Sequence, residues 1–112
     1  MHATSTTRLR ARVLVVDPDI PFLNAVCRLL LEAGHEPRRA NSLRHSLEKA
    51  DGWVPDIVIV DRMLCTEEGG HALEELIGVT AVGAVGLIVT DMAEEPVRPI
   101  ALLAEVHRRL AA

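Results

Sequence analysis

Three largely apolar runs of residues recur along the chain. They span residues 13–16, 57–60 and 84–89, and a polar residue follows each of them directly. Runs of this length that are rich in β-branched residues are typical of strands buried on both faces, as in a parallel sheet. The pattern therefore predicts three strands of such a sheet.

Segments with helical spacing of apolar residues alternate with these runs. They cover residues 22–33, 72–77 and 100–110. Pro21 and Pro99 suit the starts of the first and last of them. Because strands and helices alternate along the chain, we expect an α/β fold with a doubly wound parallel sheet.

Two weaker elements lie between the first two runs. Residues 35–40 contain Pro37 and two arginines, which indicates a strand at the edge of the sheet. Residues 41–50 have apolar positions on one helical face and a polar residue able to cap the helix. Residues 1–11 are rich in Thr, Ser and Arg, so we expect a flexible tail before a single domain at 12–112.

Composition narrows the classes of function. The chain has 112 residues, 49% apolar content and a formal charge of -4, which suits one compact domain. Its arginines are scattered apart from those at 8, 10 and 12 in the tail, so we expect no direct nucleic-acid partner. No apolar run approaches the roughly 20 residues that span a bilayer, so we expect a cytoplasmic protein without membrane contact.

The cysteines and histidines do not form a metal motif. Cys27 falls in a predicted helix and Cys65 in a predicted loop, and we interpret both as free thiols. The five histidines lack the paired spacing of a zinc site, so we expect them at the surface.

Three residues that end strands carry the candidate chemistry. Asp17, Asp61 and Thr90 each follow an apolar run, and the carboxyl ends of parallel strands share one rim of the sheet. Asp and Thr are also common in turns, so one such residue would mean little. Three such residues, each at the end of a predicted strand, favour a binding site at this rim.

The chain resembles the receiver domain of bacterial response regulators over residues 12–110. The first matching stretch covers the opening strand, its acidic loop and the first helix; the second covers the acceptor strand and its loop; the third covers the fourth strand. These stretches are VLVVDPDIPFLNAVCRLLLEAGHEP, PDIVIVDRMLCTEEGGHAL and GLIVT.

The resemblance implies a role for each residue of the rim. Asp61 matches the aspartate that accepts a phosphoryl group, and Asp17 matches an acidic ligand of Mg²⁺. Met63 matches the position whose backbone carbonyl completes the metal site, and Thr90 matches the hydroxyl residue that binds the phosphoryl group. A carboxylate can attack phosphorus only if the negative charges are offset, which a divalent cation would do.

Two differences from the family pattern concern the charged residues of this site. Pro18 stands where the family has a second acid, so Asp19 is the remaining candidate for a further metal ligand. The only lysine, Lys49, lies far from the family's lysine position. The stretch VRPIALLAEVHRRL places Arg98 there, as a candidate replacement.

A third difference from the family pattern is a shorter C-terminal half. Seven residues separate Thr90 from Arg98, too few for the fourth helix and fifth strand of the family. The strand at 84–90 would then be a sheet edge with a partly uncovered apolar face. We expect another chain to cover it, either as a homodimer through residues 84–90 or as a downstream protein.

The resemblance implies a signalling module rather than an enzyme. In the favoured interpretation, Asp61 accepts a phosphoryl group from a histidine kinase or phosphotransfer protein, and output passes through protein contacts. The alternative is a degenerate receiver that acts as an interaction or dimerisation module without phosphorylation. A remote alternative is a haloacid-dehalogenase-like phosphatase, in which Asp17 would be the nucleophile and Asp19 the general acid.

Overall fold

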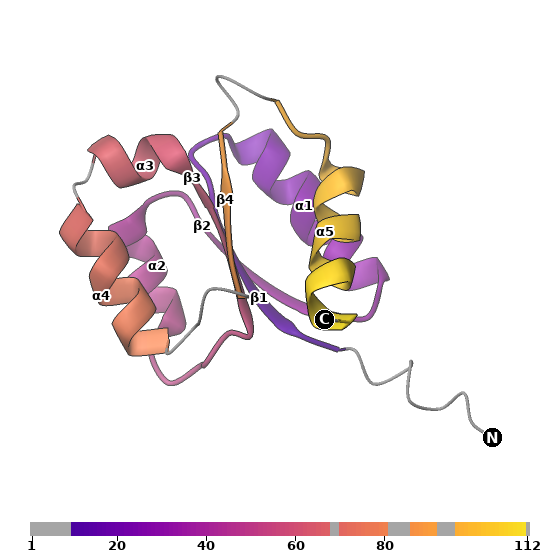
Figure 1. Ribbon diagram of the computed structural model, residues 1–112, viewed down its shortest axis with the longest axis horizontal. Coiled ribbons are helices and arrows are strands. Elements are labelled where there is room, and N and C mark those ends of the chain that lie inside the picture. Colours follow the sequence, from indigo (N-terminus) through magenta and orange to yellow (C-terminus); the bar gives the residue numbers. More distant parts are fainter. Residues whose placement is uncertain (1–9, 68–69, 81–85, 92–95, 112) are drawn as a thin grey trace.

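The computed structural model describes residues 10–67, 70–80, 86–91 and 96–111. Within these residues, one parallel sheet lies between two layers of helices (Figure 1). Its strands follow the order β2-β1-β3-β4. Their bounds are β1 Arg12–Val16, β2 Glu36–Ala40, β3 Ile57–Asp61 and β4 Leu87–Thr90. The predicted doubly wound parallel sheet is confirmed, with β2 at one edge.

The helices divide between the two faces of the sheet. Figure 1 shows α1 and α5 on one side and α2, α3 and α4 on the other. Their bounds are α1 Ile20–Glu32, α2 Leu43–Ala50, α3 Arg62–Glu67, α4 Gly70–Thr80 and α5 Pro99–Ala111. No helix in the described part of the chain is long and apolar enough to cross a membrane.

Burial on both faces explains the uninterrupted apolar runs. Val13 and Val15 of β1 pack in the core cluster beneath α1 and α5. Leu14 and Val16 face the other way and pack in the cluster beneath α2 and α4. Because successive side chains of a strand point to opposite faces, a strand with a helix layer on each side needs apolar residues at every position.

Side-chain caps explain where the first two helices begin. The carboxylate of Asp19 accepts a hydrogen bond from Phe22 N at 3.1 Å. The Ser42 hydroxyl accepts one from His45 N at 3.0 Å. Such caps satisfy backbone N–H groups that have no partner within the helix. Both helix starts therefore follow from local sequence.

The shortened C-terminal half is confirmed within the described residues. Between β4 and α5, residues 91 and 96–98 form neither a helix nor a strand. No fifth strand lies beyond β4 in the described sheet, so β4 is its second edge. The Val89 side chain on this strand is 49% exposed, because no described helix covers that end of the face.

Two boundaries differ from the sequence prediction. The helix α3 begins directly after β3, where we expected a loop, so Cys65 lies in a helix and the loop prediction was wrong. A run of six residues is too short for helical periodicity to be recognised. The strand β4 begins at Leu87, and residues 84 and 85 of the predicted strand lie outside the described residues.

The prediction of surface histidines was wrong for His35, which is only 3% exposed. Its Nδ1 accepts a hydrogen bond from the backbone N–H of Ala11, and its Nε2 lies 2.9 Å from Nε2 of His107 on α5. These contacts satisfy both ring nitrogens, so the ring is buried at low cost. Ala11, expected at the end of the tail, is itself buried. Residues 1–9 of that tail lie outside the described residues.

Candidate functional site

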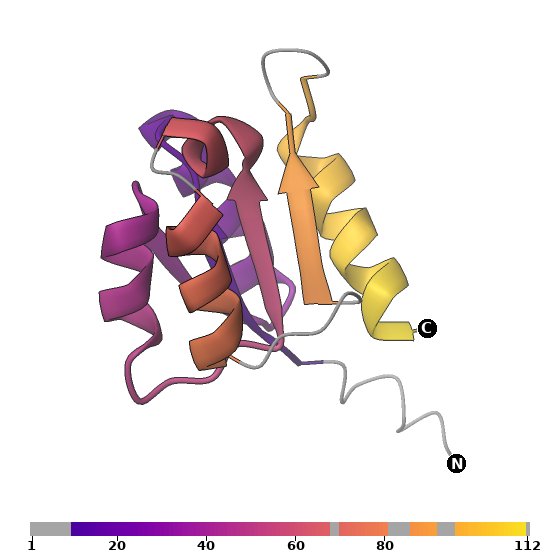
Figure 2. The ribbon, with the colours of Figure 1, turned by 60° about the vertical axis from the view of Figure 1, so that its left-hand side comes forward.

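Three neighbouring strands end at the same rim of the sheet. Asp17 follows the last residue of β1, Asp61 ends β3 and Thr90 ends β4. Because β3 lies between β1 and β4, these residues belong to adjacent strands, and Asp61 is the register partner of Thr90. Figure 2 shows β3 and β4 pointing toward the same end of the molecule. The structure thus brings the three predicted residues to one rim.

All three side chains are buried. Asp17 is 3% exposed, and Asp61 and Thr90 are each 4% exposed. Ordinary turn residues at strand ends are solvated, whereas a buried carboxylate pays a large desolvation cost. Two buried carboxylates on neighbouring strands are therefore difficult to explain by folding alone, and they favour a functional site.

The two carboxylates influence each other electrostatically. Burial raises the pKa of the Asp17 carboxyl, and the negative charges of Asp61 and Asp19 raise it further. A hydrogen bond from Asp19 N to Asp17 Oδ1, at 2.8 Å, opposes this rise in pKa. The rim therefore holds negative charge that a bound cation would stabilise.

The hydroxyl of Thr90 is oriented by the neighbouring strand. Its Oγ1 lies 3.4 Å from the carbonyl oxygen of Val60, to which it donates a long hydrogen bond. Val60 directly precedes Asp61 in β3. The hydroxyl is thus held next to the end of the strand that carries Asp61, which suits a role in binding a group attached to that aspartate.

The oxygen donors of this rim fit a divalent cation in part. Asp17 and Asp61 supply two buried carboxylates, the ligand type that Mg²⁺ prefers. Asp19 is exposed and its carboxylate caps α1, while Pro18 has no side-chain oxygen. No cluster of three or more His, Cys, Asp or Glu residues with metal-binding geometry occurs among the described residues. The cap on α1 also gives no support to Asp19 as the general acid of a phosphatase.

The residues after Asp61 form the helix α3 rather than the expected loop. Met63 is in the first turn of α3, and its side chain is 46% exposed. The thiol of Cys65 lies 3.8 Å from the backbone carbonyl oxygen of Asp61 and can donate a weak hydrogen bond to it. The helix thus positions the Cys65 side chain beside the end of β3.

Sequence reasoning missed one cation near the rim. Arg98 is exposed at the start of α5, where its backbone carbonyl accepts hydrogen bonds from Ala101 and Leu102. Arg62, directly after Asp61, instead reaches across the strand ends, with Nη1 3.7 Å from Oδ2 of Asp91. The signal that could have identified Arg62 is its position directly after Asp61, because Asp91 directly follows the neighbouring parallel strand β4 and ends at the same rim.

Comparison with solved structures identifies the fold. A response regulator receiver domain protein from Clostridium thermocellum is 21% identical and superimposes with a TM-score of 0.69, covering 90% of this chain and 94% of its own. The response regulator CheY4 of Vibrio cholerae is 25% identical with a TM-score of 0.58, covering 89% and 98%. A response regulator described as putative, from Chloroflexus aurantiacus, is 22% identical with a TM-score of 0.68, covering 92% and 99%.

Sequence comparison adds no further similarity. No family model matches the chain, and no curated protein matches it. The similarity therefore rests on the solved structures and on the strand order. The chain has the CheY-like fold of response regulator receiver domains, shortened in its C-terminal half.

Proposed function

We propose that this receiver-fold domain accepts a phosphoryl group on Asp61 and signals through protein contacts. The observation that carries the proposal is the burial of Asp17, Asp61 and Thr90 at the ends of three adjacent strands. The donor would be a sensor histidine kinase or a phosphotransfer protein of a two-component system. In this role the chain is a phosphorylated signalling module rather than an enzyme acting on a separate substrate.

The transfer requires a carboxylate nucleophile and an offset of charge. An oxygen of Asp61 bonds to phosphorus while the bond from phosphorus to the histidine nitrogen of the donor breaks. The electron pair of that bond remains with the imidazole, and the product on Asp61 is an acyl phosphate. The hydroxyl of Thr90 can donate a hydrogen bond to a phosphoryl oxygen. A Mg²⁺ ion held by Asp17, Asp61 and the Met63 carbonyl would supply positive charge during transfer.

The missing lysine leaves the phosphoryl group with fewer positive neighbours. By resemblance Arg98 takes this position, and a guanidinium can bind phosphate through two hydrogen bonds. Arg62 is a second source of charge because its guanidinium already lies near Asp91, the residue after Thr90. We propose that one of these two arginines binds the phosphoryl group on Asp61. Substitution of each arginine in turn shows which of them does so.

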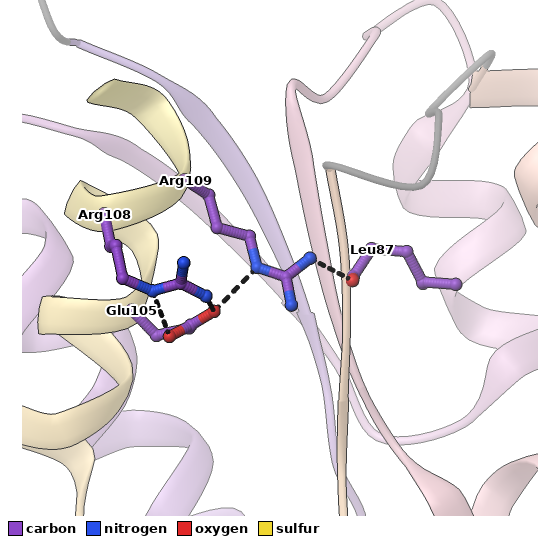
Figure 3. Close-up of polar contacts among 4 residues, drawn as sticks. All are labelled: Leu87, Glu105, Arg108 and Arg109. Carbon is purple, nitrogen blue, oxygen red and sulfur yellow. Dashed lines mark hydrogen bonds and ion pairs between the residues drawn. The ribbon is translucent and has the colours of Figure 1, made fainter. Parts of the chain in front are cut away.

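Output would pass through the uncovered side of β4. Figure 3 shows Arg109 of α5 reaching this strand, where its Nη1 donates to the Leu87 carbonyl oxygen at 2.7 Å. Glu105 holds the same guanidinium at Nε, 2.8 Å away. Arg109 therefore covers the start of the β4 edge and leaves Val89 exposed farther along. We propose that a second copy or a downstream protein pairs with this remaining edge.

A second function is favoured by the capping role of Asp19. With Pro18 beside it and Asp19 facing the helix, direct ligands for a cation are fewer than the resemblance implies. In that case the domain acts as an interaction or dimerisation module that requires no phosphorylation. The two functions share the fold and differ in whether Asp61 reacts.

Intact mass measurement separates these two functions. The full chain is incubated with Mg²⁺ and acetyl phosphate, and the mass of the product is recorded. We expect a gain of one phosphoryl group in the wild type and none in Asp61→Asn. Thr90→Ala should still accept the group but lose the accompanying change in partner binding. An unmodified wild type would exclude the phosphoacceptor function and leave the interaction module.

A further inference from the structure

A groove runs along the outer edge of β2, on the side of the sheet opposite to β4. It has a volume of about 530 Å³. Four cationic side chains line it, from α1, β2 and α2, and no acidic side chain is among the described residues that do so. These cations are Arg28, Arg38, Arg39 and Lys49. The expectation that arginines are scattered outside the tail is wrong at this place, in a chain whose formal charge is -4.

Two of the guanidinium groups are held in position from opposite faces of the sheet. Arg38 lies over the ring of Trp53, 4.4 Å from its centroid, and donates to the Lys49 carbonyl oxygen at 2.8 Å. Arg39 donates to the side-chain oxygen of Asn24 on α1. Arginines held in this way lose less conformational entropy when they bind an anion.

The backbone of β2 also faces this groove. Glu36 N bonds to Ala11 O, and Ala40 O accepts from Asp17 N, so alternate residues of β2 point toward β1. The residues between them, Pro37 and Arg39, therefore direct their backbone groups away from the sheet. Proline has no N–H, so this edge offers two carbonyl groups and the single N–H of Arg39.

We propose that the β2 edge binds an extended acidic segment of a partner protein as an additional strand. The segment's backbone would pair with Pro37 and Arg39. Its successive side chains would point to opposite faces of the sheet, where acidic groups meet Arg38 and Lys49 on one face and Arg28 and Arg39 on the other. The inference concerns a surface remote from the β4 edge and does not depend on phosphorylation of Asp61.

The same charges exclude pairing between two copies. A second β2 strand would bring its own arginines against Arg38 and Arg39, and like charges placed opposite each other are destabilising. The bound segment must therefore come from an acidic sequence. One cation is partly neutralised, because Arg28 Nε lies 3.6 Å from Glu32 Oε2, so the strongest attraction is expected around Arg39 and Lys49.

The test uses the full chain, labelled with ¹⁵N, and a short blocked peptide that alternates glutamate with valine. We expect saturable shifts at the amides of residues 36 and 38–40, slower hydrogen exchange at the Arg39 amide and weaker binding at high salt. A peptide with lysine in place of glutamate should not bind. Arg39→Gln should weaken binding about fivefold. Arg108→Gln, which removes an equal charge on α5, should leave the affinity unchanged.

Two further probes identify the mode of binding. The acidic peptide with N-methyl groups on its central residues keeps its charge but cannot pair with a strand, so it should not bind. Equal affinity for this peptide would overturn the strand model in favour of diffuse attraction. The inference also fails if pyrophosphate displaces the acidic peptide at low concentration, because the groove would then be a site for small anions. Thermal unfolding of each variant confirms that the fold is retained.

Discussion

The central strand β3 and the edge strand β4 differ in how completely the rest of the molecule covers them. Every residue of β3 is buried, whereas Val89 in the middle of β4 is half exposed. Yet both strands deliver a buried polar residue to the same rim. The three residues of the rim need only the strand ends, so they can lie together although no described helix or strand lies between β4 and α5. The candidate site at the rim and the exposed edge of β4 are therefore structurally separable.

Shortening one side chain in the buried core and one on the exposed edge of β4 should give the largest difference in the free energy of unfolding. Leu30 is fully buried among residues of β1 and β3, so Leu30→Ala should lower the free energy of unfolding by about 3 kcal/mol. Val89→Ala should change it by less than about 0.5 kcal/mol. Urea unfolding measures both values. Equal losses would show that another chain buries β4 under the conditions of the experiment.

Substitution of the two candidate arginines comes next. Arg62→Ala should slow phosphorylation of Asp61 about tenfold, because its guanidinium already lies at the ends of β3 and β4. Arg98→Ala should have a smaller effect, since Arg98 is exposed at the start of α5. Initial rates with acetyl phosphate and Mg²⁺ decide between them, and the reverse order would return the role to Arg98.

The charge at Asp17 should cost stability at neutral pH. Burial raises its pKa in the folded state above the usual 3.8, so the native protein binds this proton more tightly than the unfolded chain. Stability must therefore fall as pH rises through the interval between those two pKa values. Asp17→Asn should stabilise the protein by about 1 kcal/mol at neutral pH.

Two controls belong to this substitution. The difference between the wild type and Asp17→Asn should vanish below pH 3.8, where both side chains are uncharged. Mg²⁺ should raise the melting temperature of the wild type more than that of the variant. A less stable Asp17→Asn protein at neutral pH would show that the carboxylate contributes structure rather than unfavourable charge.

A smaller effect of pH on stability is expected at the contact between His107 of α5 and His35, which directly precedes β2. Burial, together with His107, lowers the pKa of His35 from its usual 6.5, so the native state binds this proton less readily than the unfolded chain. Stability should decline as pH falls below 6.5. His35→Gln should reduce this decline and His71→Gln, at an exposed position of α4, should not. Melting temperatures across this range measure it, and an identical decline in all three proteins would contradict the assignment.

The apolar pattern was sufficient to predict where the rim lies. Asp17, Asp61 and Thr90 were located because each interrupts a run that must be buried on both faces, and parallel strands end together. The small number of residues between Thr90 and Arg98 was sufficient to predict that no fifth strand follows β4 in the described part of the chain. These features depend on the order of residues along the chain, which can be read directly from the sequence.

Other features depend on neighbours that are distant in sequence. The burial of His35 requires His107 from the last helix, and the ordering of Arg38 requires Trp53. The capping role of Asp19 was open because its carboxylate could have faced either the helix or the rim. Such choices are decided by packing between elements rather than by local pattern.

The central claim is that Asp61 is a phosphoryl acceptor, and intact mass after exposure to Mg²⁺ and acetyl phosphate tests it most directly. We expect one added phosphoryl group on the wild type, none on Asp61→Asn and loss of the added mass on treatment with hydroxylamine, which cleaves acyl phosphates. A folded wild type that keeps its original mass would show that Asp61 does not accept the group.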